Sequence, residues 1–309
     1  MLQFAGLEQA RLPAGPLHLA IGMFDGVHLG HQSVIETAVH SARRSAGPAG
    51  VLTFWPHPSV LFRPDNPTRL LMPMAMKRAV LARLGVDVVI EQNFSREFAA
   101  VEAGEFVGWL RRRLPTLAAI YVGENWRFGR GRQGDVPALV EQARPAGLTV
   151  FSAPSLNYNG APISSSRIRE LLAAGAIDEV NAMLGYSYFT DGVVERGKQL
   201  GRTIGFPTLN IAWEPEARPA YGVYAVEVSA GLKKPLRGVA NYGLRPTTEQ
   251  TTRPLLEVHL LDSSSLTYGD KLTVNWLHYL RPEARFGSLE EMRQQIEKDR
   301  QNALKFFEK

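Results

Sequence analysis

The first half of the chain alternates apolar, strand-like runs with helix-like stretches, and this alternation restricts its possible folds more than any other feature. Alternation at this spacing predicts a parallel sheet with helices on both faces. In such sheets, ligands bind beyond the carboxyl ends of the strands. The expected strands are Leu17–Met23, Gly50–Phe54, Val86–Glu91, Leu117–Val122 and Leu148–Ala153, and the expected helices are Gln32–Arg44, Ala75–Leu84, Val101–Leu114 and Val136–Ala143.

The pattern changes after Leu184, where short β-rich runs follow one another without an intervening helix. Two helices, Ser164–Ala174 and Ile177–Leu184, precede the change. The expected strands beyond it are Tyr188–Glu195, Tyr221–Val228, Leu236–Asn241, Leu255–Leu261 and Lys271–Leu277. Turn clusters between short strands predict a small antiparallel barrel or sandwich. A final helix is expected from Ser288, with Glu291 completing a capping box. We therefore expect two domains, residues 1–185 and 186–309.

Composition narrows the functional classes only modestly. A net charge of +5 and a pI near 9.5 favour anionic ligands but do not require a nucleic acid. The chain has no cysteine, which excludes disulfides and thiolate metal sites and fits a reducing compartment such as the cytoplasm. No apolar run approaches the length of a membrane span. We expect no nucleic-acid or membrane partner, and the oligomeric state stays open.

The segment Gly22–His31 carries the clearest chemical signal. It joins an apolar run to a helical pattern and places His28 and His31 three residues apart, with Gly30 between them. The first amides of a helix lack intrahelical partners and attract anions. Two imidazoles beside those amides can contact a phosphate as negative charge develops on it. The segment therefore indicates nucleotide chemistry.

Two other glycine motifs lack the context that their spacing requires. Gly129–Gly134 fits a dinucleotide fingerprint, but it lies far from the first strand and Leu148–Ala153 contains no acidic residue, so a flexible glycine loop is the better interpretation. Gly192–Gln199 nearly matches a P-loop, but Gln199 has no hydroxyl for Mg²⁺ and glycines and a proline follow in place of a helix. Neither motif predicts a nucleotide site.

The histidine pair resembles the HxGH signature of the nucleotidyltransferase superfamily. Ile163–Arg169 resembles that superfamily's second phosphate motif, ISSTxxR, with serines at a helix start and an arginine suited to phosphate oxygens. The resemblance implies a Rossmann-like domain in which FMN or another phosphate attacks the α-phosphorus of ATP. It implies that His28 and His31 contact the transferring phosphate, while Ser164, Ser165 and Arg169 hold the leaving pyrophosphate.

Two further motifs of this half, Thr53–Pro58 and Val122–Gly129, resemble those of bacterial FAD synthetase. Many family members carry Asp-Phe where this chain has Asn125-Trp126, so the role of Asn125 stays open. His57, between two prolines, is either a turn residue or a group of the active site. Asp25 is expected to orient the first turn or a ribose.

The second half resembles riboflavin kinase through Gly201–Asn210, which matches GRxxGFPTxN with Leu209 in place of the usual alanine. Tyr221–Tyr224, Asn241–Thr247, Leu256–Leu260, Tyr268-Gly269 and Leu280–Glu283 also match that family. The resemblance implies that Thr208 and Asn210 bind Mg²⁺ and that Glu257 is the general base for the ribityl hydroxyl. Without the resemblance, Glu257 would be interpreted as a solvent-facing strand residue. Arg281 is expected to cover nucleotide or flavin.

Together the halves resemble the bifunctional bacterial riboflavin kinase/FAD synthetases. The resemblance implies a kinase barrel that makes FMN and an α/β domain that converts FMN to FAD, both using ATP and Mg²⁺. The residues expected to bind nucleotide, flavin or metal are Gly22, Phe24, Asp25, Gly30, Asn125, Ser164, Ser165, Gly201, Gly205, Thr208, Asn210 and Arg281. The alternatives are an adenylyltransferase with another acceptor, or a flavin-binding or regulatory homologue that has lost one or both activities.

Overall fold

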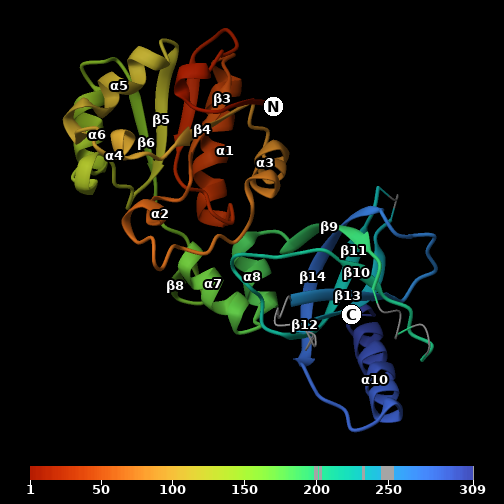
Figure 1. Ribbon diagram of the computed structural model, residues 1–309. Coiled ribbons are helices and arrows are strands. Elements are labelled where there is room, and N and C mark those ends of the chain that lie inside the picture. Colours follow the sequence, from red (N-terminus) through yellow and green to blue (C-terminus); the bar gives the residue numbers. More distant parts are fainter. Residues whose placement is uncertain (198–200, 202–203, 232–233, 245–253, 309) are drawn as a thin grey trace. The chain divides into compact units, whose positions relative to one another are not determined.

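The computed structural model describes residues 1–197, 201, 204–231, 234–244 and 254–308. The chain divides into two compact units, Met1–Ser165 and Ser166–Lys309 (Figure 1). Among the described residues, no helix is long and apolar enough to cross a membrane.

The first unit is built on a six-stranded parallel sheet in the order β1-β4-β3-β2-β5-β6. The strands are β1 (Leu2–Phe4), β2 (Leu17–Ile21), β3 (Ala49–Trp55), β4 (Val88–Asn93), β5 (Leu117–Gly123) and β6 (Thr149–Ala153). In this order, β3 lies next to β2 on one side, and β5, which comes later in the chain, lies next to β2 on the other side. The order of strands thus reverses at β2, and ligand sites of open α/β sheets form at such a reversal. The predicted parallel sheet is confirmed.

Helices cover both faces of this sheet (Figure 1). They are α1 (Leu29–Arg44), α2 (Pro58–Phe62), α3 (Met74–Arg83), α4 (Arg96–Ala99), α5 (Phe106–Arg113) and α6 (Val136–Ala143). Leu19 and Ile21 of β2 pack in a core with Phe106 of α5 and Leu139 of α6. His18, which alternates with them, faces the opposite way and is within hydrogen-bond distance (2.8 Å) of Ser45 at the end of α1.

The prediction of a helix over Val101–Leu114 is wrong for the first turn of that range. The α-helix begins only at Phe106, after a short 3₁₀ turn at Ala103–Glu105. The Val101 carbonyl accepts a hydrogen bond from the Arg130 amide at 2.7 Å, so it is already engaged by a distant loop. Strand β1, the short helices α2 and α4, and the hairpin β7–β8 (Asn157–Tyr158, Ala161–Pro162) are elements that the sequence pattern did not predict.

The second unit contains a closed antiparallel barrel in the order β10-β13-β12-β11-β14-β9, which resolves the choice between barrel and sandwich. Its strands are β9 (Phe189–Glu195), β10 (Leu209–Ile211), β11 (Gly222–Ser229), β12 (Leu236–Leu244), β13 (Pro254–Leu260) and β14 (Lys271–Pro282). Trp276, Tyr224 and Tyr242 fill its interior and are fully buried. The three-residue strand β10 lies inside the glycine- and proline-rich motif and was not predicted.

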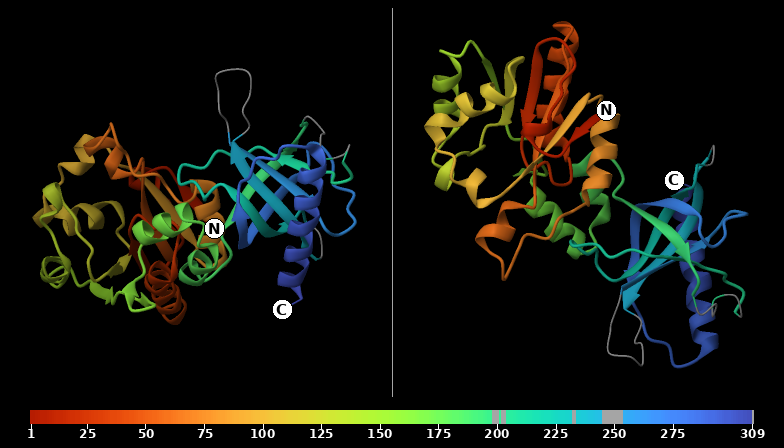
Figure 2. Two further views of the ribbon diagram at one scale, coloured as in Figure 1. Left: turned by 90° about the horizontal axis from the view of Figure 1, so that it is seen from below. Right: turned by 45° about the horizontal axis from the view of Figure 1, so that its top comes forward.

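Among the described residues, the helices that accompany the barrel include α7 (Ser165–Ala173), α8 (Ile177–Leu184) and α10 (Leu289–Phe307). Asn181 of α8 donates a hydrogen bond to the Trp276 carbonyl at 2.8 Å, which ties α8 to β14. Figure 2 shows α10 along the outside of the barrel. As predicted, Ser288 caps α10 and accepts a bond from the Glu291 amide at 3.1 Å. The Glu291 carboxylate, however, accepts from the Gly287 amide at 2.9 Å, one residue before the partner that a capping box uses.

Candidate functional site

The loop between β2 and α1 brings the two histidines into direct contact. His28 is the N-cap of α1, and its Nδ1 accepts a hydrogen bond from the His31 amide at 3.3 Å. The two rings stack with centroids 3.6 Å apart, and Phe24 meets His31 edge-on at 5.3 Å. A Cβ on Gly30 would lie only 3.3 Å from the His28 ring. The spacing of the sequence motif therefore produces one compact imidazole pair at a helix N-terminus.

Both imidazoles are neutral at physiological pH. Burial lowers the pKa of His28 to about 4. Burial also lowers the pKa of His31, and the neighbouring His28 and Lys77 lower it further. Because Nδ1 of His28 accepts a bond, its single proton is on Nε2, where it can be donated to an oxyanion. The pair can therefore donate hydrogen bonds, but it does not bring a positive charge to the site.

The rest of the loop is held by contacts with distant segments. The Asp25 carboxylate, 2% exposed, accepts bonds from the Leu71 amide at 3.0 and 3.2 Å. The Ser165 hydroxyl donates to the Asp25 carbonyl at 2.8 Å, which joins the second phosphate motif to the histidine loop. Phe24 has a positive φ of 47°, a conformation unfavourable for a side chain this large. These contacts tie the loop to two distant segments, and whether Asp25 orients the turn or a ribose stays a prediction.

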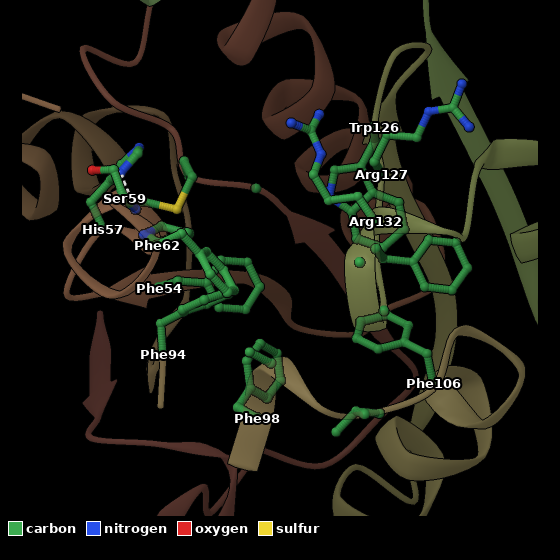
Figure 3. A pocket seen from close by; sticks show the side chains of 18 of the residues that line it. Phe54, His57, Ser59, Phe62, Phe94, Phe98, Phe106, Trp126, Arg127 and Arg132 are labelled. Carbon is green, nitrogen blue, oxygen red and sulfur yellow. Dashed lines mark hydrogen bonds between the residues drawn. The ribbon is translucent and has the colours of Figure 1, made fainter. Parts of the chain in front are cut away.

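A cavity of about 810 Å³ opens beside this loop, and Gly22 and Met23 are among the residues that line it. Aromatic rings form most of its wall, and guanidinium groups lie on the side opposite Phe54 and Phe94 (Figure 3). The aromatic members are Phe54, Phe62, Phe94, Phe98, Phe106, Trp126 and Phe128. A cavity of this size with apolar walls and few polar groups suits a flat heteroaromatic ligand. The sequence motifs did not reveal it.

Asn125 and His57 both line this cavity. The Asn125 amide donates to the Ser155 hydroxyl at 3.2 Å. His57 caps α2, because its Nδ1 accepts from the Ser59 amide at 3.0 Å. His57 is thus a turn residue that also lies on the cavity wall, so the two interpretations of it are compatible.

The glycine loop Gly129–Gly134 forms part of the same wall. Phe128 and Gly134 exchange both backbone hydrogen bonds, at 3.0 and 2.9 Å. A Cβ on Gly134 would lie 2.6 Å from the Phe128 ring, and one on Gly129 would lie 2.5 Å from the Ala103 backbone. The loop therefore supports the cavity wall through close packing of its glycines.

A second candidate site lies on the barrel. Glu257 of β13 is paired in register with Asn210 of β10 and with Asn241 of β12. Directly paired residues project from the same face of a sheet, so these three side chains gather together. Leu256 and Val258 are fully buried on the interior face, which places Glu257 on the other face. Within the described part of the chain, the Asn210 Oδ1 atom is buried without a hydrogen-bond partner.

The loop before β10 carries the other predicted residues of this site. Gly205 has a positive φ of 88°, and a Cβ on Gly201 would lie 2.3 Å from the Phe206 carbonyl. His259 of β13 lies 2.9 Å from the Pro207 carbonyl and holds the loop against the barrel close to Thr208. Lys198, Gln199, Arg202 and Thr203, and residues 245–247 of a further motif, lie outside the described residues.

Arg281 and Arg169 are placed within the second unit. Arg281 forms a two-pronged ion pair with the buried Asp299 of α10, at 2.8 and 2.7 Å. Its predicted role over a ligand stays a prediction, since the guanidinium already serves this pair. Arg169 lies on α7, and its Nη1 donates to the Ser166 hydroxyl at 3.4 Å. Ser164 directly precedes α7.

Comparisons with known proteins agree across the chain. Residues 13–167 match the family model for FAD synthetase, and residues 184–307 match that for riboflavin kinase. A bifunctional riboflavin kinase/FMN adenylyltransferase from Escherichia coli strain K12 is 39% identical, covering 94% of this chain and 92% of its own. The protein of that name from Bacillus subtilis is 35% identical with the same coverage.

A solved structure shares the fold over nearly the same length. Its title is "Crystal Structure of Macrolide-efflux Protein from Streptococcus pneumoniae"; it superposes with a TM-score of 0.87 at 27% identity and covers 97% of each chain. The likeness extends over both units, so the order of an α/β unit followed by a barrel is shared.

Proposed function

This chain belongs to the family of bifunctional riboflavin kinase/FMN adenylyltransferases, and we propose that the site on each unit carries out one of the two reactions. The protein is a transferase that phosphorylates riboflavin to FMN and adenylylates FMN to FAD with ATP. We assign adenylyl transfer to residues 1–185, which extend past the first compact unit and include the start of the second, and phosphorylation to residues 186–309. The observation that carries the first assignment is the neutral histidine pair at a helix N-terminus beside an aromatic cavity.

In the adenylyl transfer, a phosphate oxygen of FMN attacks the α-phosphorus of ATP while the bond to pyrophosphate breaks. The isoalloxazine ring of FMN occupies the aromatic cavity, which directs its phosphate toward the loop at Gly22. The His28 Nε2 proton and the first amides of α1 donate to the oxygens of the transferring phosphate. Arg169 and the serines of its motif hold the pyrophosphate. The protein positions and neutralises the reactants, with no covalent intermediate.

In the kinase reaction, the terminal ribityl hydroxyl of riboflavin attacks the γ-phosphorus of ATP and ADP leaves. The Glu257 carboxylate accepts the proton of that hydroxyl. Thr208 and Asn210 fit Mg²⁺, because they supply a hydroxyl and an amide oxygen, and Asn210 Oδ1 lacks a partner among the described residues. Mg²⁺ held by these two residues would neutralise charge on the ATP phosphates. The partners are small molecules, and we place the protein in the cytoplasm.

Product analysis tests this assignment. The protein is incubated with riboflavin, ATP and Mg²⁺, and flavins are separated by chromatography. We expect FMN to appear first and FAD to follow. His28→Asn keeps a side chain that can cap α1 but removes the imidazole, and it should abolish FAD formation while FMN still accumulates. FAD formation at the original rate in this variant would refute the assignment of the transfer site.

A further inference from the structure

A lysine that the sequence motifs do not include is buried behind the histidine loop. Lys77 lies on α3 and is only 2% exposed. Its Nζ donates to the Met23 carbonyl at 2.7 Å and lies 3.4 Å from the Thr53 hydroxyl. Thr53 donates to the same carbonyl at 3.0 Å. Met23 also lines the cavity, so the ammonium contacts the backbone of a residue that forms part of the cavity wall.

A buried ammonium is costly unless it is used or paired. The acidic groups near Lys77 are Asp25 and Glu91, and both favour its charged form. Glu91 forms a two-pronged ion pair with Arg78, and the Asp25 carboxylate accepts from the Leu71 amide. The hydrogen bonds of the lysine itself go to two uncharged oxygens, the Met23 carbonyl and the Thr53 hydroxyl.

The charge of Lys77 survives burial at neutral pH. Burial lowers its pKa to about 8, so the ammonium form still predominates at pH 7. The two histidines are neutral there, and the charge of Lys77 helps to hold the pKa of His31 low. Lys77, Asp25, His28 and His31 form a cluster behind the histidine loop, and Lys77 is therefore its positively charged member.

We propose that Lys77 is a positioning residue for adenylyl transfer, fixing the Met23 carbonyl and supplying the positive charge that the two histidines lack. The inference rests on the proposed transfer at the histidine loop. A fixed cation in a low-dielectric site stabilises the negative charge of the transferring phosphate with little solvent screening. Its bond to the Met23 carbonyl also holds the loop backbone in place. The imidazoles therefore keep their stacked position at the start of α1 during the transfer.

The first test compares Lys77→Met with Arg83→Met as a matched control. Arg83 is exposed near the end of the same helix, so its replacement removes one positive charge away from the loop. We expect Lys77→Met to lower kcat for FMN adenylylation about 100-fold, the usual order for loss of a preorganised charge or donor. The KM for FMN and the riboflavin kinase rate should stay unchanged, and Arg83→Met should leave both reactions intact.

The second test uses the unmodified protein and does not depend on how a variant folds. The kcat for FMN adenylylation should fall as pH rises through about 8, where Lys77 loses its proton. Asp25, Glu91, His28 and His31 face this region, and burial holds the pKa values of both histidines below this range, so neither imidazole changes charge there. The kinase reaction of the same molecule should lack this falling limb. Lys77→Arg, which stays charged, should move the limb to higher pH.

A folded Lys77→Met variant with unchanged kcat would overturn the inference, as would an adenylylation profile that stays level from pH 7 to well above 9 while the kinase is active. A parallel rise of KM for FMN with loss of thermal stability and no change in kcat would indicate a merely structural lysine and would overturn it as well. Failure of the proposed function is recognised separately, because His28→Asn would then retain FAD formation.

Discussion

The ion pair between Arg281 and Asp299 offers a quantitative test of what holds the last helix on the barrel. Asp299 of α10 is 3% exposed, and it accepts two bonds from Arg281 of β14 and one from Gln295 at 2.8 Å. Among the described residues of α10, Asp299 and Ala303 alone are fully buried, while Phe306 and Phe307 pack partly buried against the barrel. We therefore expect the docking of α10 to depend strongly on this pair.

Arg281→Met keeps the apolar stem of the side chain but leaves the carboxylate buried without its cation. Breaking a buried pair in this way costs about 3–5 kcal/mol. We expect the lower end, about 3 kcal/mol, because Gln295 still donates to Asp299 and the arginine side chain is one-fifth exposed. In a unit of this size that loss lowers the Tm by about 10 °C. The double variant Arg281→Met/Asp299→Leu removes both charges and should stay within about 1 kcal/mol of the original.

Urea and thermal unfolding followed by circular dichroism, together with thermal inactivation of the kinase, measure these changes. If the double variant is as unstable as Arg281→Met, the cost does not come from a stranded carboxylate and the reasoning is refuted. The double variant also tests the predicted ligand role of Arg281. A stable double variant with full kinase activity would make Arg281 structural, whereas loss of activity without loss of stability would place it on the ligand.

Three further outcomes are expected. Glu257→Gln should abolish FMN formation from riboflavin and leave the conversion of FMN to FAD intact, and loss of both in product chromatography would show that the sites are wrongly assigned. Phe62→Ala should raise the KM for FMN in adenylylation about 5- to 10-fold without lowering the Tm, because the ring is 65% exposed yet lines the cavity; an unchanged KM would remove Phe62 from the flavin site. Burial lowers the pKa of His28 from 6.5 to about 4, so the unfolded chain binds its proton more readily between those values. The first unit should therefore lose stability as pH falls from 6.5 to 4, and His28→Asn should flatten that dependence in pH-resolved melting curves.

The parts of the site that lie within one short segment were predictable from the sequence. His28 and His31 are brought together by one helical turn, so their spacing alone sets their contact. Asn210 and Glu257 required a correct motif match, because their register depends on β10, a strand of three residues that no periodicity reveals. In both cases the residue types indicate a chemistry that stays a prediction, while the partners of these side chains depend on the fold.

Lys77 and the aromatic cavity depend on contacts between distant segments. In the sequence, Lys77 reads as one polar residue of a helix, and its burial follows from how α3 packs beside β3 and the Gly22–His31 loop. The aromatic wall is contributed by β3, α2, the segments after β4 and β5, and α5. Each ring taken singly is more readily explained as core, and only their convergence on one cavity gives them a common function.

The glycine loop at Gly129–Gly134 shows why spacing without context misleads. A dinucleotide fingerprint uses glycines to let a backbone approach a pyrophosphate. Here the same residue type lets backbone and rings approach each other, since a Cβ on Gly134 would collide with Phe128 and one on Gly129 with Ala103. Phe128 in turn stacks on Trp126 with ring centroids 4.8 Å apart. These glycines thus support the aromatic wall that we assign to the flavin, and Gly134→Ala should disturb FMN binding without affecting the contacts that we assign to ATP.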